Sequence, residues 1–254
     1  MLKLIKYELM RSYRNYFMLF VVYLAVCVVV PFVANIDLLS DIFFIVFIVL
    51  VVGLSFSIFI SIVMDFWKSM FSREGYLTLT LPLSTAEVLL AKLIAAFIWV
   101  VVASFVLLLG VFILCMLLLH VMGEGVSLSE VFEAFGIVIK YIDGETLLTI
   151  VLTIVALVVS GFQSIIYLYT CMSAVHTKLV RNARPLFAII LYFLGSMVLS
   201  WILGLLGLNI DYTVSTLSEF NSLYIMQILI SGLLAVAFFF TTAYIIDNHI
   251  ELDA

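Results

Sequence analysis

Charged residues are scarce in this sequence. Asp, Glu, Lys and Arg together make up 11% of its 254 residues, whereas a typical soluble domain has about 25%. Hydrophobic residues make up 67%, and the mean hydropathy is +1.37. A chain with so little polar material cannot cover itself with a water-facing surface, and no polar block in it is long enough to form a soluble domain. Its solvent must therefore be lipid.

Cysteine and histidine are also few and scattered. The three cysteines are Cys27, Cys115 and Cys171, and each falls inside an apolar run, where cysteine behaves as a small hydrophobic residue. The histidines are His120, His176 and His249. They belong to different predicted loops or loop edges and never approach the spacing of metal ligands. We therefore expect neither a metal site nor redox chemistry.

Three kinds of functional motif are missing. The sequence has no G-x-x-x-x-G-K-[ST], so it offers no loop to cradle the phosphates of ATP. It also has no H-E-x-x-H and no pair of acids in the middle of an apolar run, whereas intramembrane proteases and proton-driven carriers normally need ionisable groups inside the membrane. We therefore expect a chain that is not an enzyme, binds no cofactor itself and depends on another polypeptide for energy.

Six apolar runs dominate what is present. A helix needs about 20 apolar residues to cross a bilayer, and the qualifying runs are residues 17–34, 42–64, 93–119, 147–172, 186–208 and 223–246. Together they predict an all-α, polytopic membrane protein with six transmembrane helices, in which residues 1–254 form a single transmembrane domain.

The basic residues predict how these spans are oriented. Ten of the eleven Lys and Arg residues flank the spans on one side, and only Lys140 falls on the other. By the positive-inside rule the basic side is cytoplasmic, so both termini are expected inside and the protein is expected in the plasma membrane. The outer loops instead carry nine acidic residues. These acids either attract cationic cargo or are simply solvated.

Two amphipathic segments are not predicted to span. Residues 1–16 repeat apolar side chains at helical spacing, with basic residues on the other faces, which predicts an interfacial helix that leads into the first span. The repeating residues are Leu2, Ile5, Leu9, Tyr13 and Tyr16. On the outer side, Ser127 and Glu130 have capping-box spacing ahead of an apolar stripe, which predicts a short helix against the outer leaflet.

Residues 65–92 form a cytoplasmic stretch between the second and third predicted spans. Ser84 and Glu87 have capping-box spacing, so a helix is expected to begin near Ser84 and to continue through Lys92 into the third span. The letters YLTLTL at 76–81 alternate as in a β-strand. No other segment could pair with a strand there, so we expect a short helix or helical turn. Exposed apolar residues between charged flanks indicate a docking segment for a partner protein.

This stretch resembles the loop after the second span in type-2 permeases of ATP-binding-cassette (ABC) transporters. The resemblance is carried by Glu74-Gly75-Tyr76-Leu77, Leu81-Pro82-Leu83-Ser84, Leu89-Leu90 and Lys92-Leu93. In the family, an acid, a glycine and a leucine precede L-P-x-S, and Tyr76 stands where threonine is usual. The six spans, the interfacial first helix and the inner termini agree as well, so the resemblance covers the whole chain. The small size looks most like permease subunits of peptide exporters, such as those that export phenol-soluble modulins.

The resemblance implies a coupling helix within residues 71–81, docked in a groove of a separate cytoplasmic ABC ATPase subunit that binds ATP and Mg. The contacting residues that it implies are Phe71, Arg73, Glu74, Gly75, Tyr76, Leu77, Leu79 and Leu81. It also implies a second permease, either another copy or a close homologue. In the second inner loop, Lys178 and Arg181 either touch the same ATPase or bind lipid phosphates.

Three of the polar residues within the predicted spans are candidates for a specific contact. Gln163 and Gln227 are expected to make interhelical hydrogen bonds, with contact to cargo as the second interpretation. Ser57 repeats with Gly53 and Ser61 at every fourth residue, a face of small residues suited to close helix contact or to the cargo pathway. The leading functional hypothesis is the permease subunit of an ABC exporter that moves amphipathic or hydrophobic cargo, such as peptides, by alternating access. The alternative is a non-transporting membrane scaffold or immunity protein that binds a toxin or peptide. Lipid is a partner in either case, and no nucleic acid is expected.

Overall fold

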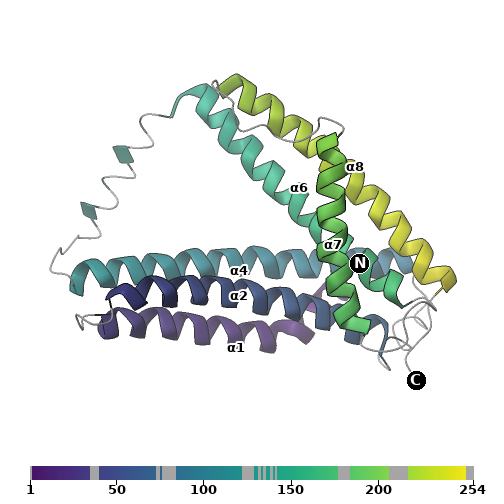
Figure 1. Cartoon of the computed structure of the whole chain (residues 1–254), viewed down its shortest axis with the longest axis horizontal. Helices are drawn as coiled ribbons and strands as arrows, with labels where there is room; N and C mark the ends of the chain where they lie inside the picture. Colours follow the sequence, from purple (N-terminus) through teal and green to yellow (C-terminus); the bar gives the residue numbers. More distant parts are fainter. Residues whose placement is uncertain are drawn as a thin grey trace. The chain divides into compact units, whose positions relative to one another are not determined.

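The computed structural model describes residues 2–34, 40–72, 75, 84–121, 129–130, 133, 136–137, 140, 142–176, 184–205 and 217–249. Six long helices account for most of them: α1 (Leu2–Ala34), α2 (Ser40–Met70), α4 (Thr85–Val121), α6 (Gly144–Val175), α7 (Arg184–Leu205) and α8 (Leu217–His249) (Figure 1). All six are long and apolar enough to cross a membrane. The predicted class, an all-α membrane protein with six spans, is confirmed.

The helices extend beyond most of the apolar runs that predicted them. With 37 residues, α4 is about 55 Å long, whereas the hydrocarbon core of a bilayer is about 30 Å thick. At least one end of α4 must therefore project beyond the hydrocarbon. The run 186–208 is the exception, because its last three residues lie outside the described part of the chain.

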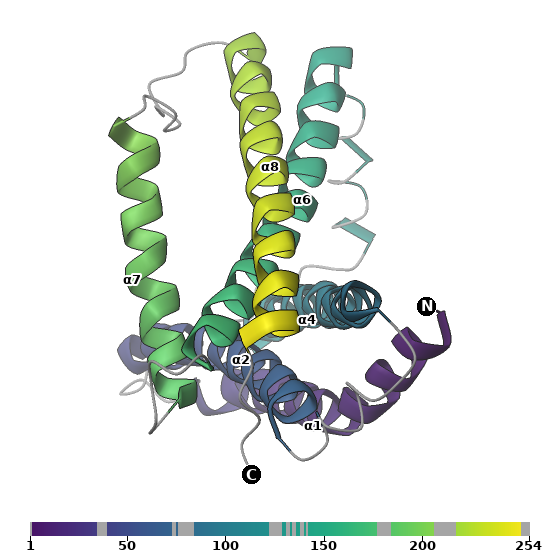
Figure 2. The same ribbon diagram turned by 90° about the vertical axis from the view of Figure 1, so that its right-hand side faces the viewer.

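The predicted interfacial helix is continuous with the first span. Helix α1 runs without a break from Leu2 to Ala34, and Figure 2 shows its N-terminal part bending away from the part beside α2 and α4. Leu2 and Tyr13 are exposed, while Tyr16 is buried. That residues 1–16 lie in the membrane surface stays a prediction. Most of the predicted outer helix, Ser127 included, lies outside the described residues, and the described positions 129–130, 133, 136–137 and 140 are helical.

The chain divides into two compact units. The first unit comprises Met1, Asp65–Phe97 and Ile142–Ala254, and the second comprises Leu2–Met64 and Ile98–Tyr141. Helices α2 and α4 contribute to both, because the last turns of α2 and the first turns of α4 belong to the first unit. The cytoplasmic stretch predicted from the sequence is thus grouped with the last three helices.

In the second unit, α1, α2 and α4 lie side by side (Figures 1 and 2). Tyr16 stacks on Trp99 with ring centroids 4.6 Å apart and planes 11° from parallel. Tyr23 donates a hydrogen bond to the carbonyl of Leu107 over 3.2 Å. Later residues of α1 thus contact later residues of α4, so the two helices are parallel. The first and third spans of a chain must be parallel when successive spans cross the membrane in opposite directions.

Gly110 makes the close approach of α1 and α4 possible. A Cβ at this position would lie 2.3 Å from Cε1 of Tyr23, and Tyr23 is buried. We expect Gly110→Ala to lower the free energy of unfolding by about 1–3 kcal/mol, as overpacking of a filled core does. Thermal unfolding in detergent micelles measures this. Gly53→Ala is the control, because a Cβ there would meet nothing within 4 Å, and equal melting temperatures for the two variants would contradict the prediction.

In the first unit, α6 and α8 run side by side (Figures 1 and 2). Near one end Thr149 donates to the side-chain carbonyl of Asn221 over 2.8 Å. Near the other end the hydroxyls of Thr170 and Thr242 are 2.8 Å apart. Both pairs are 72 residues apart in sequence, so the helices are parallel and keep one register over 21 residues, or about 31 Å.

This parallel pair requires a return crossing. Two parallel helices that both span about 30 Å of hydrocarbon must be joined by a chain that crosses back. Helix α7 lies between them in sequence and has 22 residues, enough for about 33 Å. It packs on α6, where the rings of Tyr167 and Tyr192 are 5.3 Å apart. The geometry of α6, α7 and α8 therefore fits three alternating spans.

Large apolar side chains cover the outside of the helices. Phe105, Leu229 and Phe240 are each 67–68% exposed, which a water-soluble protein rarely allows over so many positions. A helix suits a lipid environment because it satisfies its backbone hydrogen bonds internally. The surface of the fold thus agrees with lipid as its solvent.

Candidate functional site

Five aromatic side chains pack together where α2 and α6 end. We call Phe66, Trp67, Phe71, Tyr169 and His176 the aromatic cluster. Phe66 stacks on Tyr169 with centroids 3.8 Å apart and planes 9° from parallel. Phe71 stacks on His176 with centroids 3.6 Å apart and planes 6° from parallel. Two pairs of parallel rings therefore hold the end of α2 against the end of α6.

Edge contacts join the two stacks into one cluster. The ring of Phe66 meets that of Phe71 nearly at right angles, at 5.7 Å. The indole of Trp67 lies 5.9 Å from the ring of Phe71 and 4.2 Å from the imidazole of His176. Stacked and edge-to-face geometries are both favourable for aromatic pairs. The cluster thus packs as a continuous set of rings.

Local helical spacing brings these rings onto facing sides. Trp67 and Phe71 are four residues apart, and the backbone N–H of Phe71 donates to the carbonyl of Trp67 over 2.9 Å, so the helical path of α2 continues to Phe71. On α6, Tyr169, Met172 and His176 follow the i, i+3, i+7 spacing of one helix face. Phe66, Phe71, Met172 and His176 are 0–2% exposed.

The imidazole of His176 is oriented by its own helix. Its Nδ1 lies 2.9 Å from the carbonyl oxygen of Met172, and because a carbonyl only accepts, Nδ1 carries the proton in this bond. His176 is also the C-cap residue of α6. The hydrogen bond fixes the ring plane that stacks on Phe71.

A tight turn follows Phe71 and requires glycine. The N–H of Gly75 donates to the carbonyl of Ser72 over 2.8 Å. A Cβ on Gly75 would lie 2.2 Å from the backbone oxygen of Met70, and a backbone atom cannot swing aside as a side chain can. Gly75 therefore allows the chain to turn back against the end of α2.

The start of α4 lies in the same unit and forms as predicted. The N–H of Glu87 donates to the Ser84 hydroxyl over 3.3 Å, and the N–H of Ser84 donates to the Glu87 carboxylate over 3.4 Å. This reciprocal pair is a capping box, and α4 begins at Thr85, which confirms the predicted helix start. The Thr85 hydroxyl donates to the carboxylate of Asp247 in the last turn of α8, where the negative charge also suits the N-terminus of α4.

Four helix ends therefore converge in the first unit. The cluster joins the ends of α2 and α6, the bond from Thr85 ties the start of α4 to the end of α8, and the Tyr169 hydroxyl reaches the carbonyl of Lys92 over a long 3.5 Å. Lys92 itself is only 4% exposed. All four ends are assigned by the sequence to the cytoplasmic side. Their convergence agrees with four helix ends on the same side of the membrane, but it does not identify that side as the cytoplasmic one.

The structure changes the role of one predicted contact residue. Phe71 was expected to face the ATPase, but its side chain is 0% exposed and packs inside the aromatic cluster, so it anchors the segment within this chain. Gly75 is also buried. The other predicted contacts, Arg73, Glu74, Tyr76, Leu77, Leu79 and Leu81, lie outside the described residues, as do Lys178 and Arg181 of the second inner loop.

Ser57, Gln163 and Gln227 are the polar residues that the sequence singled out within the spans. The Ser57 hydroxyl donates to the carbonyl of Gly53, one turn earlier in its own helix, over 2.7 Å. By the register of 72 between α6 and α8, Gln163 is level with residue 235, eight residues or about 12 Å from Gln227. The two amides are therefore too far apart to bond to each other. The expected helix contact of Ser57 and the expected partners of the two amides stay predictions.

Phe66, Trp67, Tyr169 and His176 belong to the cluster but were not singled out from the sequence as site residues. His176 was assigned only to a loop edge. The available signal was the density of rings near that side of the membrane, with Phe66, Trp67 and Phe71 within six residues. Aromatic residues are common at both membrane interfaces, so density alone did not indicate a cluster.

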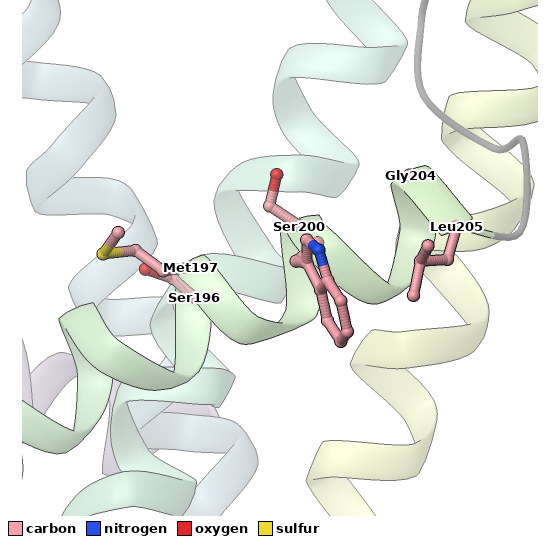
Figure 3. Close-up of a pocket in the computed structure, with 6 residues that line it drawn as sticks. Ser196, Met197, Ser200, Gly204 and Leu205 are labelled. Atoms are coloured by element: carbon pink, nitrogen blue, oxygen red, sulfur yellow. The ribbon is translucent and has the colours of Figure 1, made fainter.

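A hollow of about 730 Å³ follows one face of α7 (Figure 3). It is lined by Ser196, Met197, Ser200, Trp201, Gly204 and Leu205. Ser196, Ser200 and Gly204 repeat every fourth residue, a spacing of small side chains that permits close helix approach in membranes. All six lining residues come from one helix, so the hollow by itself indicates no ligand. Among the residues that the structure describes, no group of three His, Cys, Asp or Glu side chains could hold a metal ion.

Fold and site together define a multi-pass, all-helical membrane protein whose helix ends meet in an aromatic cluster. Comparison with protein-family models, with curated proteins and with solved structures gave no match. That the chain is a type-2 ABC permease therefore stays a prediction, which rests on the resemblance of the loop after the second span.

Proposed function

We propose that this chain is the permease subunit of an ATP-driven ABC exporter. In this proposal it pairs with a second permease, binds a separate cytoplasmic ATPase and moves amphipathic or hydrophobic cargo such as peptides out of the cell. It is placed in the plasma membrane with both termini in the cytoplasm. Closure of two ATPases around ATP would move the coupling segments and tilt the spans, which gives alternating access.

The observation that supports the proposal best is where the coupling segment is attached. The segment that resembles the family begins at Phe71, and Phe71 is locked by stacking to α6, while the helix that follows the segment begins at Thr85 beside the end of α8. A force on such a segment would reach α4, α6 and α8 directly, in addition to α2. A docking loop without transport would need no such attachment.

A separate ATPase is the first partner to test. We expect the affinity-tagged chain, expressed in its native host, to co-purify with a polypeptide that carries G-x-x-x-x-G-K-[ST]. Only the complex should hydrolyse ATP, because the sequence of this chain has no such motif. Phosphate release by the complex and by the isolated chain is the measurement.

Two results would contradict the proposal. The first is ATP hydrolysis by the isolated chain at the rate of the complex. The second is recovery of the chain without any such ATPase under conditions in which other membrane complexes stay intact, which would favour a scaffold or immunity protein. Export of candidate peptides from reconstituted vesicles would then identify the cargo.

A further inference from the structure

We propose that His176 is a positioning residue that fixes the start of the coupling segment. Its imidazole lies flat against Phe71 at 3.6 Å and beside Trp67 at 4.2 Å. His176 is the last described residue before the second inner loop, and Phe71 is the first residue after α2. The stack therefore joins the first residue after α2 to the first residue after α6, where the chain leaves both helices.

The chemistry of the pair explains why a planar ring is needed at position 176. Phe71 and His176 are both 0% exposed, so water does not compete for their faces. The bond from Nδ1 to the Met172 carbonyl, 2.9 Å long, sets the rotation of the imidazole. Helix α6 thus presents a ring that is already oriented for stacking. The imidazole loses no further rotational freedom when it stacks on Phe71. A flexible apolar side chain at 176 would fill space without fixing the ring of Phe71.

The consequence for coupling rests on the proposed function. With Phe71 held by α6, movement of the coupling segment must also move α6, and through the Thr170–Thr242 contact it reaches α8. Without the stack, the segment would still present its docking residues to the ATPase but would transmit movement poorly. ATPase binding and transport should therefore separate when position 176 is changed.

Hydrogen–deuterium exchange on the purified chain tests the positioning role without any ATPase. His176→Asn keeps a donor for the Met172 carbonyl but removes the ring, and we expect exchange in residues 71–81 to speed up about three- to tenfold. His176→Phe keeps a planar ring but loses the bond to Met172, so its exchange should be faster than in the unaltered protein and clearly slower than in His176→Asn. Cys171→Ala, a change at another buried position of α6, should leave exchange in 71–81 unaltered.

Phe71→Leu breaks the same stack by changing the other residue of the pair. The test then does not depend on the correct folding of one variant alone. If the two residues act as a pair, the double variant His176→Asn/Phe71→Leu should exchange no faster than either single variant, since neighbouring residues that share one interaction are not additive. Additive effects would overturn the proposal. So would exchange in His176→Asn at the rate of the unaltered protein, or exchange in His176→Phe as fast as in His176→Asn.

Transport distinguishes this inference from the proposed function. In the complex, His176→Asn should retain ATPase co-purification and ATP hydrolysis while peptide export per ATP hydrolysed falls about three- to tenfold. Unchanged export per ATP would overturn the coupling role of His176 even if exchange is faster. An unaltered chain that binds no ATPase would instead refute the proposed function, and the exchange results would still decide the positioning role.

Discussion

Replacing both Leu77 and Leu79 with Asp should lower ATPase binding by several orders of magnitude. In the proposed complex these leucines enter an apolar groove, and an unpaired carboxylate there costs several kcal/mol unless it is neutralised. About 1.4 kcal/mol corresponds to a tenfold change in affinity, and the central apolar anchors of an interface carry most of its binding energy. Co-purification with the tagged permease measures the loss.

The matched control for this variant is Leu128→Asp, in the segment predicted on the outer side. It adds a carboxylate to an apolar position of the predicted outer helix, and it should leave ATPase binding intact. Membrane insertion of both variants is checked by their yield in detergent extracts. Full co-purification of the ATPase with the Leu77→Asp/Leu79→Asp variant would show that residues 71–81 are an ordinary loop.

Phe66→Ala should cause the largest loss of stability among single substitutions in the aromatic cluster. Phe66 is 2% exposed, stacks on Tyr169 and meets the edge of Phe71, so its removal leaves a cavity at the junction of α2 and α6. Truncation of a buried phenylalanine costs about 3–5 kcal/mol. Unfolding in detergent micelles, followed by tryptophan fluorescence, measures the change in free energy of unfolding.

Phe56→Ala on the same helix is the control for Phe66→Ala. Phe56 is 55% exposed and faces lipid or detergent in an isolated chain, so its truncation leaves no cavity and should change stability by less than about 0.5 kcal/mol. Equal losses for the two variants would mean that the cluster contributes no packing energy beyond that of any apolar side chain.

The spans followed directly from the sequence. Runs such as 93–119 and 147–172 have no alternative to a helix once lipid is the solvent, because a spanning backbone must satisfy its own hydrogen bonds. The start of α4 was equally local, since Ser84 and Glu87 need only their own spacing to cap a helix. Length, apolarity and capping are properties of neighbouring residues, and a sequence contains them in full.

Only the tertiary structure decided which residues meet. Phe71 was expected to dock on a partner because the family resemblance implies a coupling helix within residues 71–81, yet Phe71 packs on His176, 105 positions later in the chain. His176 looked like a loop residue because it follows the end of the fourth predicted span, 147–172. The parallel register of α6 and α8 likewise depends on side chains 72 residues apart. Hydrophobicity drives every apolar side chain out of water without choosing its partner, and packing makes that choice through shape.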